Sequence, residues 1–341
     1  MPVLLVVSAL AGVVMASAVA WMVRPPDRRE VILRGAVATL LAIVVTTSAG
    51  AITDAEEISF LIAISFGAAP IAILLGAAAG EAAPGRRSVA RLLVWTWSGV
   101  VFPVCVVVPS LLYRSCAAPE CRVEDFGGGL ALLVSSSASV LLAWRAHSEA
   151  EGRRWARFGL PVAVLWVGAA AWLVSLEGAI DSYSARILLA AVLAPLAGGI
   201  AWLVVDVLRQ SGRHPLRSYA DGVVAGLVAI IPGAASVSFP WSLVVGALAG
   251  AAAALVFGAK RMRSAGRAGH WAIVALTATA IGYLAPAISG DTIGFMFSGR
   301  LAAFVPPLAT FLAVAAFGVV MSTPAWSLAR RGSTGRGSPS D

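Results

Sequence analysis

Few side chains in this sequence could carry acid–base, metal or nucleophilic chemistry. Proteolysis by a Ser–His pair, haem ligation by two histidines and histidine metal sites all need imidazoles at the reacting centre. The chain has 341 residues and only 3 His, which lie in or beside charged segments between long apolar runs: His147, His214 and His270. Clusters of cysteine or carboxylate do not replace them. The sequence therefore predicts neither an enzyme nor a site for a metal or cofactor.

Charged residues are too sparse for a water-soluble fold. They make up 12% of the chain, while 59% of the residues are hydrophobic and the mean hydropathy is +0.89; a soluble domain is about 25% charged. The charges divide the sequence into apolar runs of roughly 16 to 23 residues, the length of a helix that crosses the ~30 Å hydrocarbon core of a bilayer. Alternating segments of about ten residues, typical of membrane barrels, are absent. We therefore predict an all-α, multi-pass protein of the cell (plasma) membrane.

Eleven transmembrane helices are predicted from these runs. Their ranges are Pro2–Val23, Val31–Ala51, Ile58–Ala79, Leu92–Leu112, Phe126–Trp144, Phe158–Leu176, Ile187–Leu208, Gly222–Val237, Trp241–Ala259, Trp271–Ile288 and Leu301–Ser322. Only Ser238-Phe239-Pro240 separates the eighth run from the ninth. One continuous helix here would be about 57 Å long at 1.5 Å per residue, nearly twice the thickness of the membrane core. We therefore expect a tight hairpin at this point.

Arginine sets the predicted orientation. Of the 25 Lys and Arg residues, all but Arg114, Arg122, Arg186 and Arg300 fall on one side of the eleven-helix scheme. The positive-inside rule then places the N-terminus outside and the C-terminus inside. The same rule accounts for the net charge of +8 without a nucleic-acid partner.

The chain divides into a transmembrane domain, residues 1–329, and a cytoplasmic tail, residues 330–341. The tail is rich in Gly and Ser and is expected to be disordered, and its arginines can contact anionic lipid headgroups.

Cys116 and Cys121 lie in an outer loop, where an oxidising environment permits a disulfide. Cys105 is expected to be a small apolar residue of the fourth helix.

Glycines spaced four apart predict closely packed helices. They occur in the eighth and ninth runs as Gly222, Gly226, Gly246 and Gly250, and small residues at this spacing let neighbouring helices approach. Eleven spans without a catalytic cluster or a soluble domain leave transport, conduction or a transporter-derived sensor as the classes of function.

The segment Asp125-Phe126-Gly127-Gly128-Gly129 resembles the Asp-Phe-Ala-Gly-Gly motif at the outer end of the fifth helix in Amt/Rh ammonium transporters. Gly222-Val-Val-Ala-Gly-Leu-Val-Ala-Ile-Ile-Pro-Gly233 is similar to the family's Gly-Ala-Val-Ala-Gly-Leu-Val-Ala-Ile-Thr-Pro, and Met22-Val23-Arg24 to the end of its first helix. The resemblance covers nearly the whole chain. It implies an Amt/Rh-like bundle with an inverted 5+5 pseudo-repeat, a homotrimer, and ammonium or ammonia as the molecule transported.

Three residues fall on the outer pore site that the resemblance implies. Phe66 and Trp172 match the two stacked aromatics that close the family's outer mouth, although two membrane aromatics in ordinary packing would give the same pattern. Asp125 matches an acid that shapes the outer site through backbone contacts. An N-capping role at the start of the fifth helix fits Asp125 equally well.

The chain departs from the family at the middle of the pore. The family has one imidazole on the fifth helix and one on the tenth, and the matching positions here are Leu133 and Ala275. Ser135, Ser136 and Ser137 follow soon after Leu133 and either face the pore or bond to helix carbonyls.

The loss of both imidazoles bears on what can cross. A charged group at the bilayer centre costs about 2.5–3.5 kcal/mol on insertion scales and more than 10 kcal/mol in simulations, and 10 kcal/mol slows passage about ten-million-fold. We therefore expect conduction of a small neutral solute such as ammonia, without net charge. A non-conducting sensor or interaction scaffold with the same fold is the alternative, and a transporter for an unrelated substrate is a third possibility.

Partners follow from the same resemblance. Ammonium or ammonia, membrane lipids and two further copies of the chain are expected. The family can be closed by a cytosolic nitrogen-signalling trimer of the PII type that docks on inner loops and the C-terminal tail. The tail of this chain is short and gives such a regulator little to bind.

Overall fold

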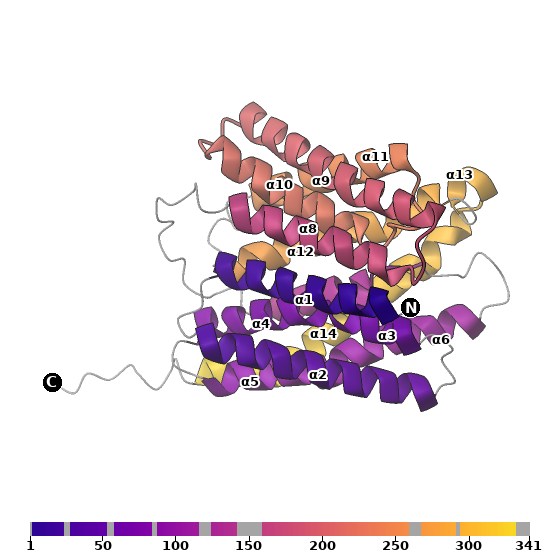
Figure 1. Ribbon diagram of the computed structural model, residues 1–341. Helices are drawn as coiled ribbons and strands as arrows, with labels where there is room; N and C mark the ends of the chain where they lie inside the picture. Colours follow the sequence, from indigo (N-terminus) through magenta and orange to yellow (C-terminus); the bar gives the residue numbers. More distant parts are fainter. Residues whose placement is uncertain are drawn as a thin grey trace.

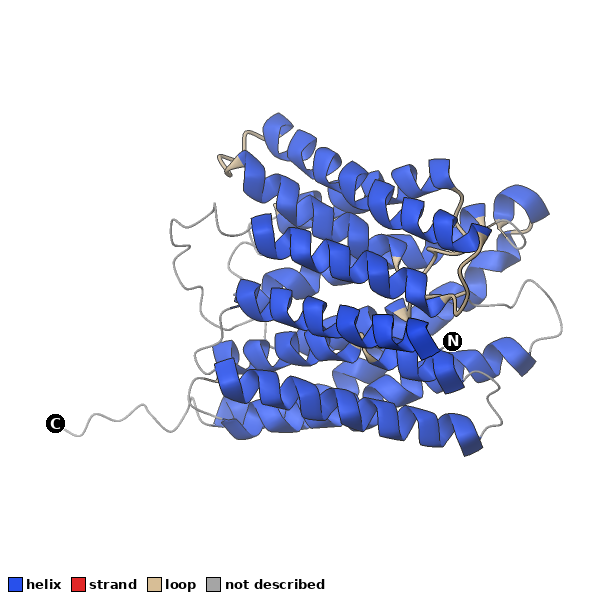
Figure 2. Ribbon diagram, viewed as in Figure 1, coloured by secondary structure: helices blue, strands red, loops and turns tan. Residues whose placement is uncertain are grey.

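The computed structural model describes residues 2–23, 28–52, 58–83, 87–115, 124–141, 159–258, 267–290 and 294–331. These residues form a bundle of long, roughly parallel or antiparallel helices (Figures 1 and 2). Within the described ranges the secondary structure is helical except for one isolated β-bridge, between Val237 and Gly290. The all-α prediction is confirmed.

The helices follow one another in the order predicted from the apolar runs. They are α1 (Pro2–Val23), α2 (Arg28–Ile52), α3 (Ile58–Ser65), α4 (Ala68–Ala82), α5 (Arg87–Thr96), η1 (Trp97–Val101), α6 (Phe102–Ser115), η3 (Leu130–Val134), α7 (Ser135–Leu141), α8 (Gly159–Leu176), α9 (Ser182–Leu208), α10 (Pro215–Ile230), α11 (Phe239–Phe257), α12 (Arg267–Ser289), α13 (Phe295–Ser298), η5 (Leu301–Phe304) and α14 (Val305–Arg331). Each of the eleven predicted ranges contains one helix or two or three in tandem.

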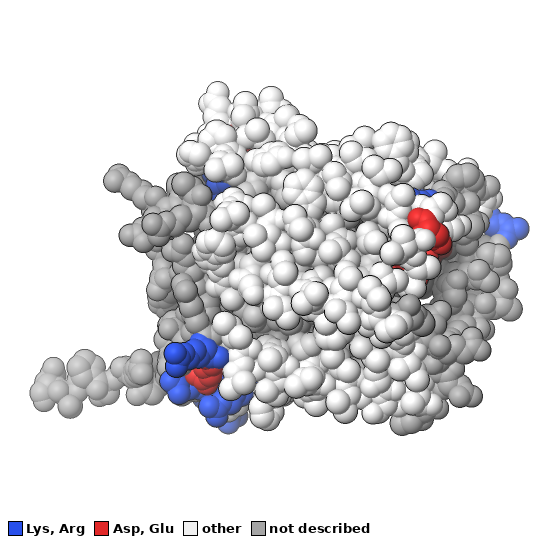
Figure 3. Space-filling model, viewed as in Figure 1, with Lys and Arg blue, Asp and Glu red and all other residues white. Residues whose placement is uncertain are grey.

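Nine of these segments, counted over the described residues, are long and apolar enough to cross a membrane. The fifth and eighth predicted spans are the shorter ones. The described helix of the fifth is Leu130–Leu141, and the eighth is the 16-residue α10. On the face of the molecule shown in Figure 3, acidic and basic side chains lie towards the two ends and leave an uncharged belt between them. This distribution suits a protein surrounded by lipid.

The eighth helix, which the sequence places at Gly222–Val237, is shifted towards the N-terminus at both of its ends. In the structure α10 begins at Pro215. Proline suits the first helical turn because an N–H at this position would have no hydrogen-bond acceptor within the helix, so its absence costs nothing. The helix ends at Ile230, and a turn leads to α11 at Phe239. The predicted hairpin is present, but its turn starts earlier than Ser238.

Helix packing repeats between the two halves of the bundle. In the first half α2 packs on α4 and α4 on α5, and in the second half α9 packs on α10 and α10 on α11. The halves meet where α1 packs along α8 and α7 against α12, and Figure 1 shows them as neighbouring layers with α14 on the side of the first half. Two repeats of five helices give this pairing pattern.

The glycines of α10 and α11 allow the closest helix contacts. A Cβ atom built at Gly226 or Gly246 would collide with the carbonyl of Ala194 on α9, and one built at Gly222 or Gly250 would collide with that of Gly198. All four predicted packing glycines therefore contact the same helix, which the small-residue rule explains.

Candidate functional site

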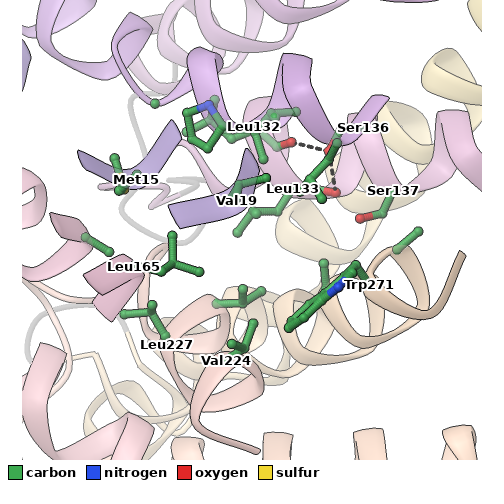
Figure 4. A pocket seen from close by; sticks show the side chains of 18 of the residues that line it. Met15, Val19, Leu132, Leu133, Ser136, Ser137, Leu165, Val224, Leu227 and Trp271 are labelled. Atoms are coloured by element: carbon green, nitrogen blue, oxygen red, sulfur yellow. Dashed lines mark hydrogen bonds between the residues drawn. The ribbon is translucent and has the colours of Figure 1, made fainter. Parts of the chain in front are cut away.

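The described part of the bundle contains a partly open cavity of about 120 Å³. Six helical segments contribute to its wall: α1, α4, η3 with α7, α8, α10 and α12. The segments come from both halves of the chain, and Figure 4 shows their side chains converging on one space. The cavity therefore lies where the two halves meet.

The two positions matched to the family's histidines are both in this wall. Leu133 comes from η3, and Ala275 comes from α12. The rest of the wall is almost entirely hydrocarbon, with Met15, Val19, Leu165 and Leu227 among the side chains that point inward (Figure 4). No charged side chain of the described residues reaches it. The described wall therefore offers no imidazole or carboxylate that could take up a proton.

Trp172 borders the cavity beside a break in the third span. The helix is interrupted between α3 and α4 at Phe66 and Gly67, whose N–H groups donate to the carbonyls of Ala63 and Ile64 at 3.3 and 3.0 Å. The Trp172 indole N–H donates to Ala63 at 3.0 Å. Trp172 and Gly67 both line the cavity.

Phe66 lies just outside that wall. Its backbone is so close to α1 that a Cβ atom on Gly12 would lie 2.8 Å from the Phe66 carbonyl oxygen. Among the described aromatic residues no ring contact joins Phe66 to Trp172. The structure thus puts both residues at the same helix break without stacking them, and a gate formed by the pair stays a prediction.

Asp125 stabilises the start of the fifth span through backbone hydrogen bonds. Its carboxylate accepts from the N–H groups of Gly129 at 2.6 Å and Leu130 at 2.9 Å. These are two of the donors that a helix start leaves unpaired, so Asp125 acts as a helix cap. Asp125 does not line the cavity.

Two of the three sequence segments that carry the family resemblance, Asp125–Gly129 and Gly222–Gly233, contact each other directly. The N–H of Phe126 donates to the Pro232 carbonyl at 2.8 Å, and that of Gly127 donates to the Ile231 carbonyl at 3.1 Å. Gly128 has a positive φ of 65°, a backbone conformation that glycine adopts without strain. The glycine-rich entry of the fifth span is therefore fixed to the end of α10.

The three serines after Leu133 differ in what their hydroxyls do. Ser135 donates to the Ala131 carbonyl at 2.5 Å and accepts from the Trp97 indole at 2.8 Å. Ser136 lines the cavity but donates to the Leu132 carbonyl. Ser137 lines the cavity, and its oxygen points into it (Figure 4). The sequence left open whether these serines face the pore or bond to helix carbonyls. Ser135 and Ser136 bond to carbonyls, and the Ser137 hydroxyl faces the cavity.

Trp271 is a wall residue that the sequence did not single out. It lies on α12 and is largely buried. Residues four apart on a helix share a face, so Trp271 stands one turn before Ala275, and Ser137 stands one turn after Leu133. Helical spacing from Ala275 would have identified Trp271, whereas the π-helical turn that contains Leu133 leaves the facing of Ser137 open.

A buried ionic cluster lies beyond Trp271, near the start of α10. The Asp221 carboxylate is fully buried and pairs with Arg213 and with Arg217, at 2.9 Å for the latter. The His270 Nε2 lies 3.5 Å from the same carboxylate.

His270 is not in the cavity wall, and His214 is an exposed residue at the start of α10. His147, Cys116 and Cys121 lie outside the described residues; Cys105 is buried with a free thiol.

Comparison with known proteins finds sequence similarity to ammonium transporters. The profile of the Ammonium Transporter Family matches residues 46–330. Ammonium transporter 2 of Schizosaccharomyces pombe is 29% identical in an alignment 201 residues long, and the alignment covers 54% of this chain and 37% of that protein. The ammonium transporter of Mycobacterium tuberculosis is 28% identical over 151 residues, 42% of this chain and 31% of that protein. The aligned part of this chain thus spans about a third of these relatives.

Solved structures share the fold over most of the chain. Candida albicans Mep2 superposes with a TM-score of 0.78 at 17% identity and covers 94% of this chain and 83% of its own. A structure described as a Sensor Amt Protein superposes with a TM-score of 0.75 at 13% identity, covering 96% of this chain and 92% of its own.

Proposed function

The chain belongs to the Ammonium Transporter Family, and from this premise we propose that it conducts ammonia, or another small neutral solute, across the membrane without net charge. The route runs from the Asp125 end of the bundle past Trp172, through the cavity, to Trp271. Ammonium would release its proton to water at the entrance, and ammonia would cross and take up a proton on the other side. The proton itself would not pass.

The observation that carries this proposal is the hydrocarbon wall at Leu133 and Ala275. A cation in this wall would meet no counter-charge and no proton relay among the described lining residues, and its transfer would cost several kcal/mol or more. A neutral molecule avoids that penalty. The cavity volume of about 120 Å³ exceeds the ~10–15 Å³ that one water-sized molecule needs.

The location and assembly of the protein belong to the same proposal. We place it in the plasma membrane with its N-terminus outside, as the arginine distribution predicts, and we expect a homotrimer in which each subunit has its own pore. Exposed apolar side chains along α1 and α2, such as Leu10, Val13, Leu33 and Leu40, suit contact with lipid or with a neighbouring subunit.

A non-conducting sensor is the second candidate. Two observations favour it: both histidine positions are occupied by apolar residues, and the fold matches a protein described as a Sensor Amt Protein. A sensor would need to bind its ligand but not to release it on the far side of the membrane.

The test is a flux measurement in proteoliposomes that contain a pH-sensitive dye. Ammonium chloride is added outside, and ammonia that enters takes up a proton and raises the internal pH. We expect wild-type protein to accelerate this rise over protein-free vesicles, and Ala275→Phe, which fills the cavity, to abolish the acceleration. Equal size-exclusion profiles would show that both variants are folded.

Two results would decide against the proposal. If wild-type and Ala275→Phe vesicles behave like protein-free vesicles, ammonia conduction is wrong and the non-conducting sensor is favoured. If ammonium evokes a robust electrical current in the wild-type protein, charge is transported and the neutral mechanism is wrong.

A further inference from the structure

Ser137 presents an unpartnered hydroxyl to an otherwise apolar cavity. The residue is only 4% exposed, lies on α7 and forms part of the cavity wall. No hydrogen bond within the described part of the chain reaches its side chain. Buried polar groups normally have a partner, so an exception calls for an explanation.

The neighbouring serines show what Ser137 does not do. Ser135, Ser136 and Ser139 each donate to the carbonyl four residues earlier, a common bond for serine within a helix. The equivalent acceptor for Ser137 is the Leu133 carbonyl, which lies 3.3 Å from the Ser136 hydroxyl instead. The Ser137 oxygen turns towards the cavity (Figure 4). Its hydrogen-bonding capacity is therefore available to a molecule inside.

The polarity of the cavity limits which molecule that is. Water needs two to four polar partners to reside stably inside a protein, and apolar cavities of similar size stay dry. Here the wall offers the free hydroxyl of Ser137 and the oxygen of Ser136, whose proton is already bonded to Leu132. Water would therefore lose most of its hydrogen bonds on entry.

A neutral amine fits this arrangement better than water does. Its one strong hydrogen-bonding group is a single lone pair, and a hydroxyl is one donor. Ammonium has no lone pair and four N–H groups, so it could use Ser137 only as an acceptor and would leave its charge unpaired in hydrocarbon. The site therefore selects for a lone pair and against a charge.

We propose that the Ser137 hydroxyl is the substrate-binding group of the cavity and donates a hydrogen bond to the lone pair of ammonia or of a small neutral amine. The proposal rests on the conduction pathway proposed above. It assigns to Ser137, one helical turn from Leu133, the recognition of the neutral substrate at the middle of the route.

The test compares Ser137→Ala with Ser139→Ala in the proteoliposome flux measurement. Ser139 is the matched control because it lies on the same helix, but its hydroxyl bonds to the carbonyls of Ser135 and Gly318, away from the cavity. A single hydrogen bond corresponds to a threefold to tenfold effect. We expect Ser137→Ala to reduce ammonia flux by about this factor, Ser137→Thr to retain most of it, and Ser139→Ala to leave it unchanged.

A binding measurement separates this proposal from the conduction proposal. Methylamine at alkaline pH, where part of it is neutral, should raise the melting temperature of the wild-type protein but not that of Ser137→Ala, because a ligand stabilises the state that binds it. Tetramethylammonium, which has no lone pair, should stabilise neither.

Each combination of results is decisive. If the wild-type protein conducts and Ser137→Ala conducts equally well, the Ser137 proposal is wrong and conduction stands. If the wild-type protein does not conduct, the conduction proposal is wrong, and the melting-temperature shift caused by methylamine alone tests the Ser137 site. A shift that is present in the wild-type protein and lost in Ser137→Ala supports the site. Equal shifts in both proteins, or no shift in either, overturn it.

Discussion

Gly67, between α3 and α4, lies directly against the Trp172 indole of α8. A Cβ atom added at Gly67 would lie 2.8 Å from Cζ2 of Trp172 and 2.8 Å from Cδ1 of Leu132. Real Cβ atoms do not come this close to other atoms, so glycine is required here for the helix break to pack against Trp172. The contact fixes the side of the cavity that Trp172 borders.

The first prediction follows from this contact. Gly67→Ala forces Trp172 and Leu132 out of their positions and should destabilise the protein by about 1–3 kcal/mol, as overpacking does in other cores. A thermal melt in detergent measures the effect. We also expect the displaced indole to lower ammonia flux.

The control for Gly67 is Gly80, which lies in α4, the helix that follows Gly67. A Cβ atom at Gly80 would have no heavy atom within 4 Å, so Gly80→Ala should be neutral or stabilising by up to about 1 kcal/mol, because alanine favours helix over glycine. Equal destabilisation by the two substitutions would contradict the role given to Gly67.

The second prediction concerns the capping role of Asp125. Asp125→Ala removes the acceptor for the Gly129 and Leu130 N–H groups and should cost about 0.5–2 kcal/mol of stability. Asp125→Asn keeps an acceptor oxygen without the charge and should retain most of the stability and the ammonia flux. A large loss of flux in a stable Asp125→Asn protein would mean that the negative charge itself acts on the substrate.

The third prediction restores the two imidazoles. If the apolar wall is what prevents charge movement, the double variant Leu133→His with Ala275→His should produce an ammonium-evoked current that the wild-type protein lacks, since two imidazoles in one cavity could relay a proton. Each single variant lacks the second imidazole and should give much less current. A double variant that folds and still carries no current would show that another part of the route blocks protons.

The fourth prediction concerns the buried acid of α10. Removing one partner of a buried ion pair leaves an uncompensated charge, at a cost of about 3–5 kcal/mol. Asp221→Ala leaves Arg213 and Arg217 without this carboxylate and should lower the melting temperature strongly, or prevent expression, whereas Asp221→Asn should be milder because it retains hydrogen bonding.

A more exposed acid provides the comparison for Asp221. Glu30 also pairs with arginines, among them Arg34 and Arg87, but its side chain is 21% exposed, compared with 0% for Asp221. The hydrogen bond from Arg34 lowers the pKa of Glu30, so these pairs stay ionised at neutral pH. Solvent weakens such exposed pairs, and Glu30→Gln should shift the melting temperature much less than Asp221→Ala. Equal shifts would show that burial is not what makes Asp221 important.

The amino-acid sequence by itself determined the class of fold and the number of helices. Run length and the spacing of charges are properties of short segments, and a segment of about 20 apolar residues has no alternative to a helix in a bilayer. The sequence also singled out Leu133, Ala275 and Trp172, which line the cavity; their roles in a pore stay predictions. The predicted start of α10 at Gly222 was wrong because the charges of Arg217 and Asp221 favoured a loop before that residue. In the structure these two residues form an ion pair inside the bundle.

Only the tertiary structure decided which side chains meet. The break at Phe66 and Gly67 and the π-helical turn η3 rotate the faces of their spans, so a regular helical period cannot tell whether Ser135, Ser136 or Ser137 faces the cavity. The answer depends on which carbonyl each hydroxyl finds and on the helices from the other half of the chain that close the opposite wall. Such contacts join residues more than a hundred positions apart, and no local pattern in a sequence records them.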